Sequence, residues 1–212
     1  DYLFVCCFKL LADYAGSLRS LQLNSRSMEK ILNGELGQMD RRYDLNMSVN
    51  DYLDNISGKT AELFALSCTA GALESGNSEK FAKQCGEIGL NIGIAFQIID
   101  DILDYSQPES QIGKPVLEDV RQGVYSLPLL LAMEKDRAAF VPLLSKQDQM
   151  TEADTQAVYQ LVQTKGGVTQ AQKQAQRYTE KALKAIRKLP DDEQNTRELL
   201  WRLTKQILDR QN

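Results

Sequence analysis

The segment from residue 87 to residue 105, EIGLNIGIAFQIIDDILDY, restricts the possible folds of this chain more than any other. Its residues are apolar on almost every side of a helix, which is typical of a helix that neighbouring elements bury all round. Strand-like alternation is missing, and apolar residues recur at three- and four-residue spacing elsewhere, as in residues 49–73. We therefore predict an all-α helical bundle that forms a single domain over residues 1–212.

Charged residues at the end of this buried helix require an explanation. At about 100° of rotation per residue, four polar side chains share one sector, and a stripe of glycines continues that sector toward the N-terminus. The polar residues are Gln97, Asp100, Asp101 and Asp104, and the glycines are Gly86, Gly89 and Gly93. The pattern predicts a cavity wall, with small residues deep inside and three carboxylates at the mouth.

Three carboxylates within one helical turn repel one another, and burial makes them bind either protons or cations. Mg²⁺ prefers oxygen ligands and usually takes one or two protein carboxylates together with substrate phosphates. The alternative is a solvated acidic helix end, which is the common reading of an acidic run. The apolar helix that precedes the cluster favours the Mg²⁺ site.

A loop after the helix contains Pro108 and Gly113, which mark it as irregular, and it presents Lys114. A lysine about ten residues beyond a metal-binding carboxylate can close over a diphosphate as a point charge. Taken alone, Lys114 is better explained as a solvated surface lysine.

Several stretches of the chain together resemble a trans-type polyprenyl diphosphate synthase of the isoprenoid synthase family. The stretches are GELGQ (34–38), YLDNISGKTAELFALSC (52–68), AFQIIDDILDY (95–105), GKPVLEDVRQG (113–123), SLPLLLA (126–132) and the helical segment 166–190. The combination of FQxxDDxxD with a following loop and GK is specific. The helical C-terminal third would match many proteins.

The resemblance implies roles for individual residues. The three aspartates Asp100, Asp101 and Asp104 match the second aspartate-rich motif, which holds Mg²⁺ against the diphosphate of an allylic substrate. Lys59 and Lys114 match lysines that contact this diphosphate.

Three further residues match positions close to the reacting carbon atoms. Thr60 and Gln97 match polar groups beside the developing allylic cation, and Phe96 matches an aromatic residue near the isopentenyl diphosphate site. Without the resemblance, Lys59 and Thr60 would pass as ordinary helix-surface residues.

The implied activity is Mg²⁺-dependent condensation of isopentenyl diphosphate with an allylic diphosphate to give a polyprenyl diphosphate. The alternative is a noncatalytic interaction subunit of a heteromeric prenyl synthase. The resemblance also implies a dimer, with either an identical or a different partner.

The chain departs from the family pattern in two ways. No DDxxD precedes Asp100, so the first aspartate-rich motif and the N-terminal helices of the bundle are missing. We expect the chain to be the C-terminal two-thirds of the family domain and to be inactive alone. Val124 stands where many relatives place a lysine, which removes one diphosphate contact.

Composition excludes other classes of function. The net charge of -4 argues against nucleic acid as a partner. The chain has no histidine and no CxxC, which excludes ordinary zinc sites and histidine-dependent catalysis. SGKT at 57–60 lacks the glycine and the preceding strand of a P-loop. No transmembrane segment is expected, and the cysteines suit a reducing, cytoplasmic location.

Overall fold

The computed structural model of the chain describes residues 2–105 and 117–209. These residues form helices in chain order and contain no strand. The elements are α1 (Tyr2–Tyr14), α2 (Leu18–Asp40), α3 (Val49–Ile56), η1 (Ser57–Ala61), α4 (Glu62–Glu74), α5 (Glu79–Leu103), α7 (Glu118–Arg121), α8 (Leu127–Lys135), α9 (Arg137–Leu144), η2 (Gln147–Gln149), α10 (Glu152–Thr164), α11 (Gly167–Ile186) and α12 (Thr196–Leu208). The predicted all-α class is confirmed.

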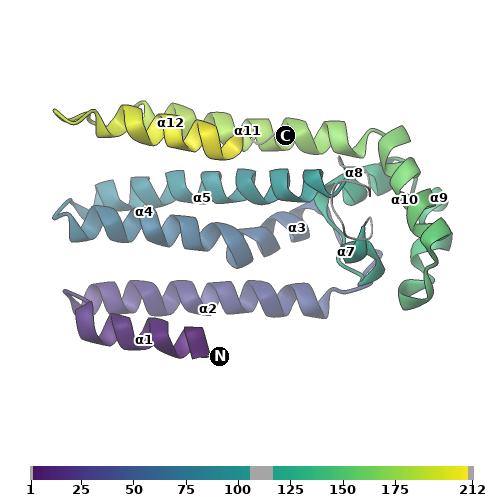
Figure 1. Cartoon of the computed structure of the whole chain (residues 1–212), viewed down its shortest axis with the longest axis horizontal. Coiled ribbons are helices and arrows are strands. Elements are labelled where there is room, and N and C mark those ends of the chain that lie inside the picture. Colours follow the sequence, from purple (N-terminus) through teal and green to yellow (C-terminus); the bar gives the residue numbers. More distant parts are fainter. Residues whose placement is uncertain (1, 106–116, 210–212) are drawn as a thin grey trace.

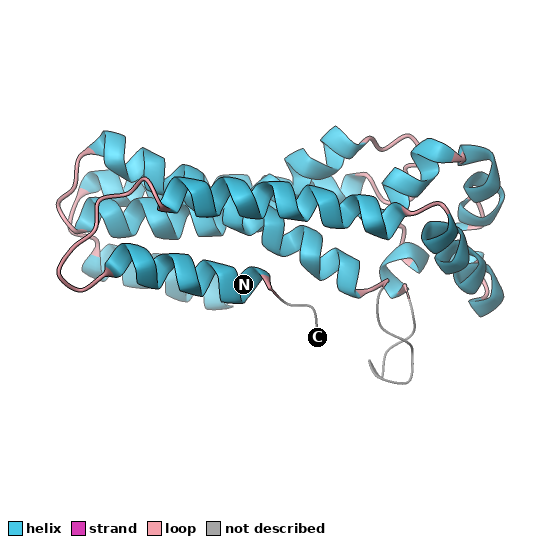
Figure 2. Ribbon diagram, turned by 90° about the horizontal axis from the view of Figure 1, so that it is seen from above, coloured by secondary structure: helices cyan, strands magenta, loops and turns pink. Residues whose placement is uncertain are grey.

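The long helices lie in three layers (Figure 1). α1 and α2 form one outer layer, α3, α4 and α5 form the middle layer, and α11 and α12 form the other outer layer. α5 packs against both α4 and α11, and α2 packs against η1 and α4. The view from above shows the long helices running along the length of the molecule (Figure 2). α5 is therefore the central helix, as its apolar sequence predicts.

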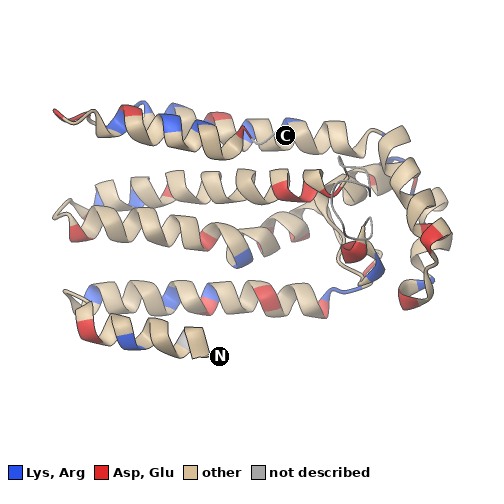
Figure 3. Ribbon diagram, viewed as in Figure 1, with Lys and Arg blue, Asp and Glu red and all other residues tan. Residues whose placement is uncertain are grey.

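The ends of α5 follow from local sequence. The Ser78 side chain accepts a hydrogen bond from the backbone N–H of Phe81, which satisfies one of the free donors at the start of the helix. Along the helix, Ile98 is fully buried in the same cluster as Leu127 and Phe140. Figure 3 shows acidic residues at the opposite end of α5, close to α7. The central helix therefore carries its carboxylates to one end of the bundle.

On α5, Gly89 and Gly93 do not form the predicted cavity wall, whereas Gly86 lines a pocket between α2, α4 and α5. A Cβ atom built on Gly93 would lie 2.5 Å from Ala61 Cα, and one on Gly89 would lie 2.4 Å from the Phe64 carbonyl oxygen. These distances are far below van der Waals contact, so the missing side chains allow α5 to lie directly against η1 and α4. The cavity prediction is wrong for Gly89 and Gly93 because periodicity cannot distinguish a face beside a void from a face beside another backbone.

The helical pattern of residues 49–73 is interrupted. Ser57–Ala61 forms one turn of π-helix between α3 and α4. α3 begins after Ser48, whose side chain and that of Asp51 form a capping box. π-Turns inside helical segments are rare and occur frequently at functional sites. In this chain the π-turn contains Lys59 and Thr60.

A membrane-spanning role finds no support in the described helices, since none combines the length and apolar character needed to cross a bilayer.

Candidate active site

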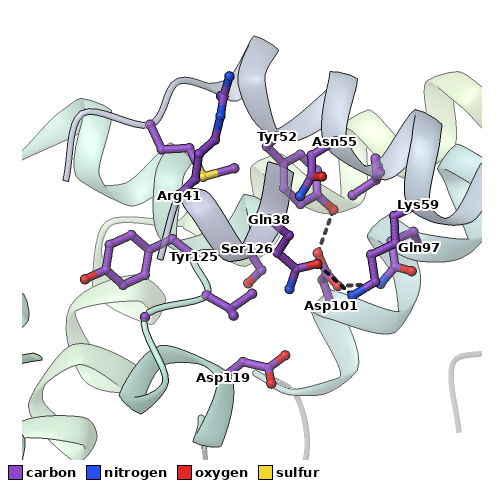
Figure 4. Close-up of a pocket in the computed structure, with 14 residues that line it drawn as sticks. Gln38, Arg41, Tyr52, Asn55, Lys59, Gln97, Asp101, Asp119, Tyr125 and Ser126 are labelled. Carbon is purple, nitrogen blue, oxygen red and sulfur yellow. Dashed lines mark hydrogen bonds between the residues drawn. The ribbon is translucent and has the colours of Figure 1, made fainter. Parts of the chain in front are cut away.

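A pocket lies where α2, α3, η1 and α5 meet the segment that joins α7 to α8 (Figure 4). Its lining combines charged and polar side chains from elements far apart in the sequence. The polar lining residues are Gln38, Arg41, Tyr52, Asn55, Lys59, Gln97, Asp101, Asp119, Tyr125 and Ser126. Three predicted site residues, Lys59, Gln97 and Asp101, are therefore in one pocket.

Close backbone packing places Lys59 at this pocket. A Cβ atom on Gly34 of α2 would lie 2.4 Å from the backbone nitrogen of Lys59, so the absence of a side chain allows η1 to rest against α2. The Lys59 ammonium donates to Gln38 Oε1 at 2.7 Å and lies 3.3 Å from Glu35 Oε2. The side chain of Lys59 is 34% exposed, so its charge remains accessible from the pocket.

Hydrogen bonds in series join three elements of the site, and Figure 4 shows the two that Asp101 accepts, from Tyr52 and Gln97. The Thr60 hydroxyl donates to Gln97 Oε1 at 2.7 Å, and Gln97 Nε2 donates to Asp101 Oδ1 at 2.8 Å. The Tyr52 hydroxyl donates to Asp101 Oδ2 at 2.6 Å. The donations run from Thr60 to Gln97 and from Gln97 and Tyr52 to Asp101, so the Asp101 carboxylate is the final acceptor.

The Asp101 carboxyl has an unusual electrostatic environment. Burial raises its pKa to about 7, although the hydrogen bonds from Tyr52 and Gln97 act in the opposite direction, and the charges of Asp104 and Asp100 raise it further. Burial, together with the Asp101 charge, raises the pKa of Tyr52 well above its ordinary value. Tyr52 consequently remains a hydrogen-bond donor. A cation close to Asp101 would stabilise the ionised form of its carboxyl group.

Asp100 and Asp104 lie at the end of α5 and are exposed, whereas Asp101 is half-buried. Within residues 2–105 and 117–209, no three His, Cys, Asp or Glu side chains are gathered closely enough to hold a metal by themselves. Mg²⁺ usually takes only one or two protein carboxylates and completes its shell with water and phosphate oxygens. The donors at this helix end fit a cation that is shared with a diphosphate.

The remaining predicted residues lie beside the pocket or outside the described part. The half-buried Phe96 has its ring centroid 5.5 Å from that of Phe64, one turn after Thr60. These two rings form an apolar patch next to the polar chain. Lys114 lies outside the described residues.

The wall opposite α5 is fixed by backbone contacts. Tyr43 N–H donates to the Gly123 carbonyl at 2.9 Å, and the Tyr43 hydroxyl donates to the Arg121 carbonyl at 3.1 Å. Gly123 has a φ of +80°, and a Cβ atom there would lie 2.6 Å from the Tyr43 ring. This contact holds Val124 in the pocket lining, at the position where the family resemblance leads one to expect a lysine.

Sequence reasoning assigned no role to several residues that the structure places in the pocket. Among them are Gln38, Tyr52 and Asp119. Tyr52 occupies an apolar position of the helical pattern and is 3% exposed, so its pattern indicates a core residue. Its bond to a carboxylate 49 residues away leaves no local signal in the sequence. Only the family-matching stretches 34–38, 52–68 and 113–123 contain a hint of these residues.

Comparison with known proteins relates the sequence and the fold of the chain to other proteins. The family model described as polyprenyl synthetase matches residues 1–162. A heptaprenyl diphosphate synthase component 2 of Geobacillus stearothermophilus is 32% identical over 194 residues, which are 91% of this chain and 60% of that protein. The solanesyl diphosphate synthase 2 of Arabidopsis thaliana chloroplasts is 30% identical over 190 residues and is covered to 45%.

Solved structures agree with the sequence comparison. A crystal structure of a geranylgeranyl pyrophosphate synthase from Lactobacillus brevis has a TM-score of 0.92 and 41% identity, covering 99% of this chain and 65% of that chain. A polyprenyl synthase from Caulobacter crescentus, crystallised with calcium and isoprenyl diphosphate, has a TM-score of 0.88 and 33% identity, covering 100% of this chain and 65% of that chain.

The chain thus spans about half to two thirds of the length of these relatives. The helical bundle, the pocket at the aspartate-bearing end of α5 and the match over residues 1–162 all agree. The chain belongs to the polyprenyl synthetase family.

Proposed function

We propose that the protein is a Mg²⁺-dependent prenyltransferase that condenses isopentenyl diphosphate with an allylic diphosphate to give a polyprenyl diphosphate. The observation that carries this proposal is the chain from Thr60 through Gln97 to Asp101, in a pocket that also contains the Lys59 ammonium. Mg²⁺, when bound, supplies positive charge beside the leaving diphosphate. Asp101, with Asp100 and Asp104 on the same helix end, would hold it.

The predicted site residues have the following proposed roles. Lys59 binds a diphosphate oxygen, and its charge is worth most when the diphosphate becomes more negative as its bond to carbon breaks. Lys114, which follows α5 in the sequence, is proposed to have the same task. The oxygens of Thr60 and Gln97 stabilise positive charge on the allylic carbons, and Phe96 packs beside isopentenyl diphosphate. No covalent protein nucleophile is required.

Steady-state synthesis from radiolabelled isopentenyl diphosphate and an allylic diphosphate by the full-length protein, since this chain is expected to be inactive alone, tests the proposal. Asp101→Ala should lower kcat/KM by at least about 100-fold, since an electrostatic group in a preorganised site is worth about 2.7–4 kcal/mol. Asp148→Ala, at an exposed position in η2, is the matched control and should leave turnover unchanged. Turnover of Asp101→Ala near that of the control across Mg²⁺ concentrations would exclude the assigned site.

A noncatalytic subunit of a heteromeric synthase is the second candidate. Two relatives are described as component 2 of a heptaprenyl diphosphate synthase, which supports a heteromeric assembly. Pyrophosphate release by the purified full-length protein distinguishes the two. Release without any added protein supports the enzyme, whereas release that requires a separate partner protein and survives Asp101→Ala supports the subunit.

We also propose that a second copy of the chain covers the outer face of α1 and α2. Large apolar side chains recur there at helical spacing, with Leu32 46%, Leu36 56% and Met39 58% exposed. Sedimentation analysis should give a dimer that Leu36→Glu dissociates. Leu199→Glu, at an equally exposed leucine of α12, should leave the dimer intact. A monomeric wild type would exclude this interface.

The four cysteines, Cys6, Cys7, Cys68 and Cys85, are free thiols. They support the proposal of a cytoplasmic location, where thiols remain reduced.

A further inference from the structure

The side chain of Tyr52 is connected to the site by an unusually well-defined contact. Its ring belongs to the buried core and is 3% exposed, so packing fixes its position. Its hydroxyl donates to Asp101 Oδ2 at 2.6 Å. This length is that of a charge-assisted O–H···O bond, which is stronger than a bond between neutral groups.

The two oxygens of the Asp101 carboxylate have different donors. Oδ2 accepts from Tyr52 on α3, and Oδ1 accepts from the amide of Gln97 on α5. The Gln97 amide is itself oriented, because its oxygen accepts from Thr60 and only its NH₂ group remains for Asp101. The carboxylate plane is thereby held at both oxygens.

The Asp101 carboxylate has acceptor positions left for a cation. Each carboxylate oxygen has about two acceptor positions, and among the described residues one donor occupies one of them on each side. One position per oxygen remains for a cation. Asp100 and Asp104 are exposed and lie on the same helix end, whereas Asp101 is half-buried and bonded to a core side chain.

We propose that Tyr52 is a positioning residue, which orients the Asp101 carboxylate for a divalent cation shared with a diphosphate. The inference rests on the proposed function, because the cation belongs to the same site. Partners that orient a metal-binding side chain typically change metal affinity 10- to 100-fold when they are removed. In this proposal Tyr52 acts through Asp101, because its hydroxyl donates to that carboxylate.

The test is Mn²⁺ binding to the purified protein in the presence of inorganic pyrophosphate, measured by electron paramagnetic resonance. Tyr52→Phe keeps the buried ring and removes one donor, and it should raise the Mn²⁺ Kd about 10- to 100-fold. Tyr105→Phe is the matched control. It removes a buried hydroxyl next to the end of α5 that lies 3.4 Å from Ser126 Oγ, and it should leave the Kd unchanged.

A double-mutant cycle separates positioning from general destabilisation. In the Asp101→Asn background, Tyr52→Phe should change the Mn²⁺ Kd less than about twofold, because the residue then has no carboxylate to orient. Equal effects in both backgrounds would show a purely structural role and overturn the inference. So would a Tyr52→Phe Kd equal to that of the wild type while Asp101→Asn binds weakly.

The proposed function fails in a different manner. If Asp101→Asn binds Mn²⁺ as tightly as the wild type, Asp101 is not a ligand, and both the metal assignment and the role of Tyr52 are excluded. If the wild type shows no saturable binding, the shared cation site is excluded and the inference is overturned with it. Thermal unfolding of each variant establishes that the Kd values come from folded protein.

Discussion

Replacing Gly93 by alanine tests whether backbone contact between helices builds the site. The added Cβ would lie 2.5 Å from Ala61 Cα, 2.9 Å from Ala61 Cβ and 3.0 Å from Phe64 Cδ2. Carbon atoms are in comfortable contact at about 3.5–4.0 Å, so α5 must move away from η1 by about 1 Å at this point. The nearest atom belongs to the backbone and cannot rotate out of the way.

The expected loss of stability follows from two opposing terms. Overpacking of a core costs about 1–3 kcal/mol, and the tight backbone contact places Gly93→Ala at the upper end. Alanine in place of glycine within a helix raises the free energy of unfolding by about 0.8–1 kcal/mol. The net loss is about 2 kcal/mol, which corresponds to a decrease in Tm of about 4–8 °C for a chain of this size.

Gly71→Ala in α4 is the matched control, because Gly71 is exposed and nothing lies within 4 Å of its added Cβ. It should raise stability by about 0.5–1 kcal/mol. Differential scanning calorimetry measures both variants. A Gly93→Ala protein as stable as Gly71→Ala would refute the close approach of α5 and η1. Gly93 also lies one turn before Gln97, so its replacement should weaken Mn²⁺ binding as well.

Two further predictions concern other parts of the molecule. Gly123→Ala should cost about 1–2 kcal/mol more than Gly76→Ala in urea unfolding: both glycines have positive φ, +80° and +78°, but only Gly123 would place a Cβ against Tyr43. Hydrogen bonds from Lys146 and Thr151 lower the Asp154 pKa to about 2 in the folded protein. As pH falls from about 4 to 2, the Asp154 carboxylate therefore takes up a proton in the unfolded chain before it does so in the folded protein. Stability should decrease over that window, and Asp154→Asn should flatten the decrease in acid-unfolding curves. A parallel curve for the variant would contradict this assignment.

The sequence was sufficient to predict the helical class and the buried central helix, because both depend on apolar periodicity. It also identified Asp101, Gln97 and Lys59, which the fold brings into one pocket. It was insufficient where a residue acts on a distant partner. Gly34 is unremarkable in the sequence, yet its lack of a side chain admits the backbone of Lys59.

The three aspartates illustrate the limit more sharply. They lie within five residues of the sequence and are predicted as one cluster, yet Asp101 is half-buried while Asp100 and Asp104 are exposed. Asp101 accepts hydrogen bonds from Tyr52 and Gln97. Local spacing gives the sector of a helix on which a side chain lies, but not which neighbouring helix covers that sector.

The π-turn explains how residues from α3 and η1 reach the same partners. Tyr52 and Thr60 are eight residues apart, and in a regular helix this spacing corresponds to two full turns plus about 80°, so the two side chains would face different directions. A π-turn accommodates one additional residue, which reduces the effective spacing to about seven and returns both to one face. Tyr52 can then bind Asp101 while Thr60 binds Gln97 one turn earlier on α5. Gly34 and Gly93 press the backbone of η1 between α2 and α5, and this packing stabilises the turn that a uniform helical period could not predict.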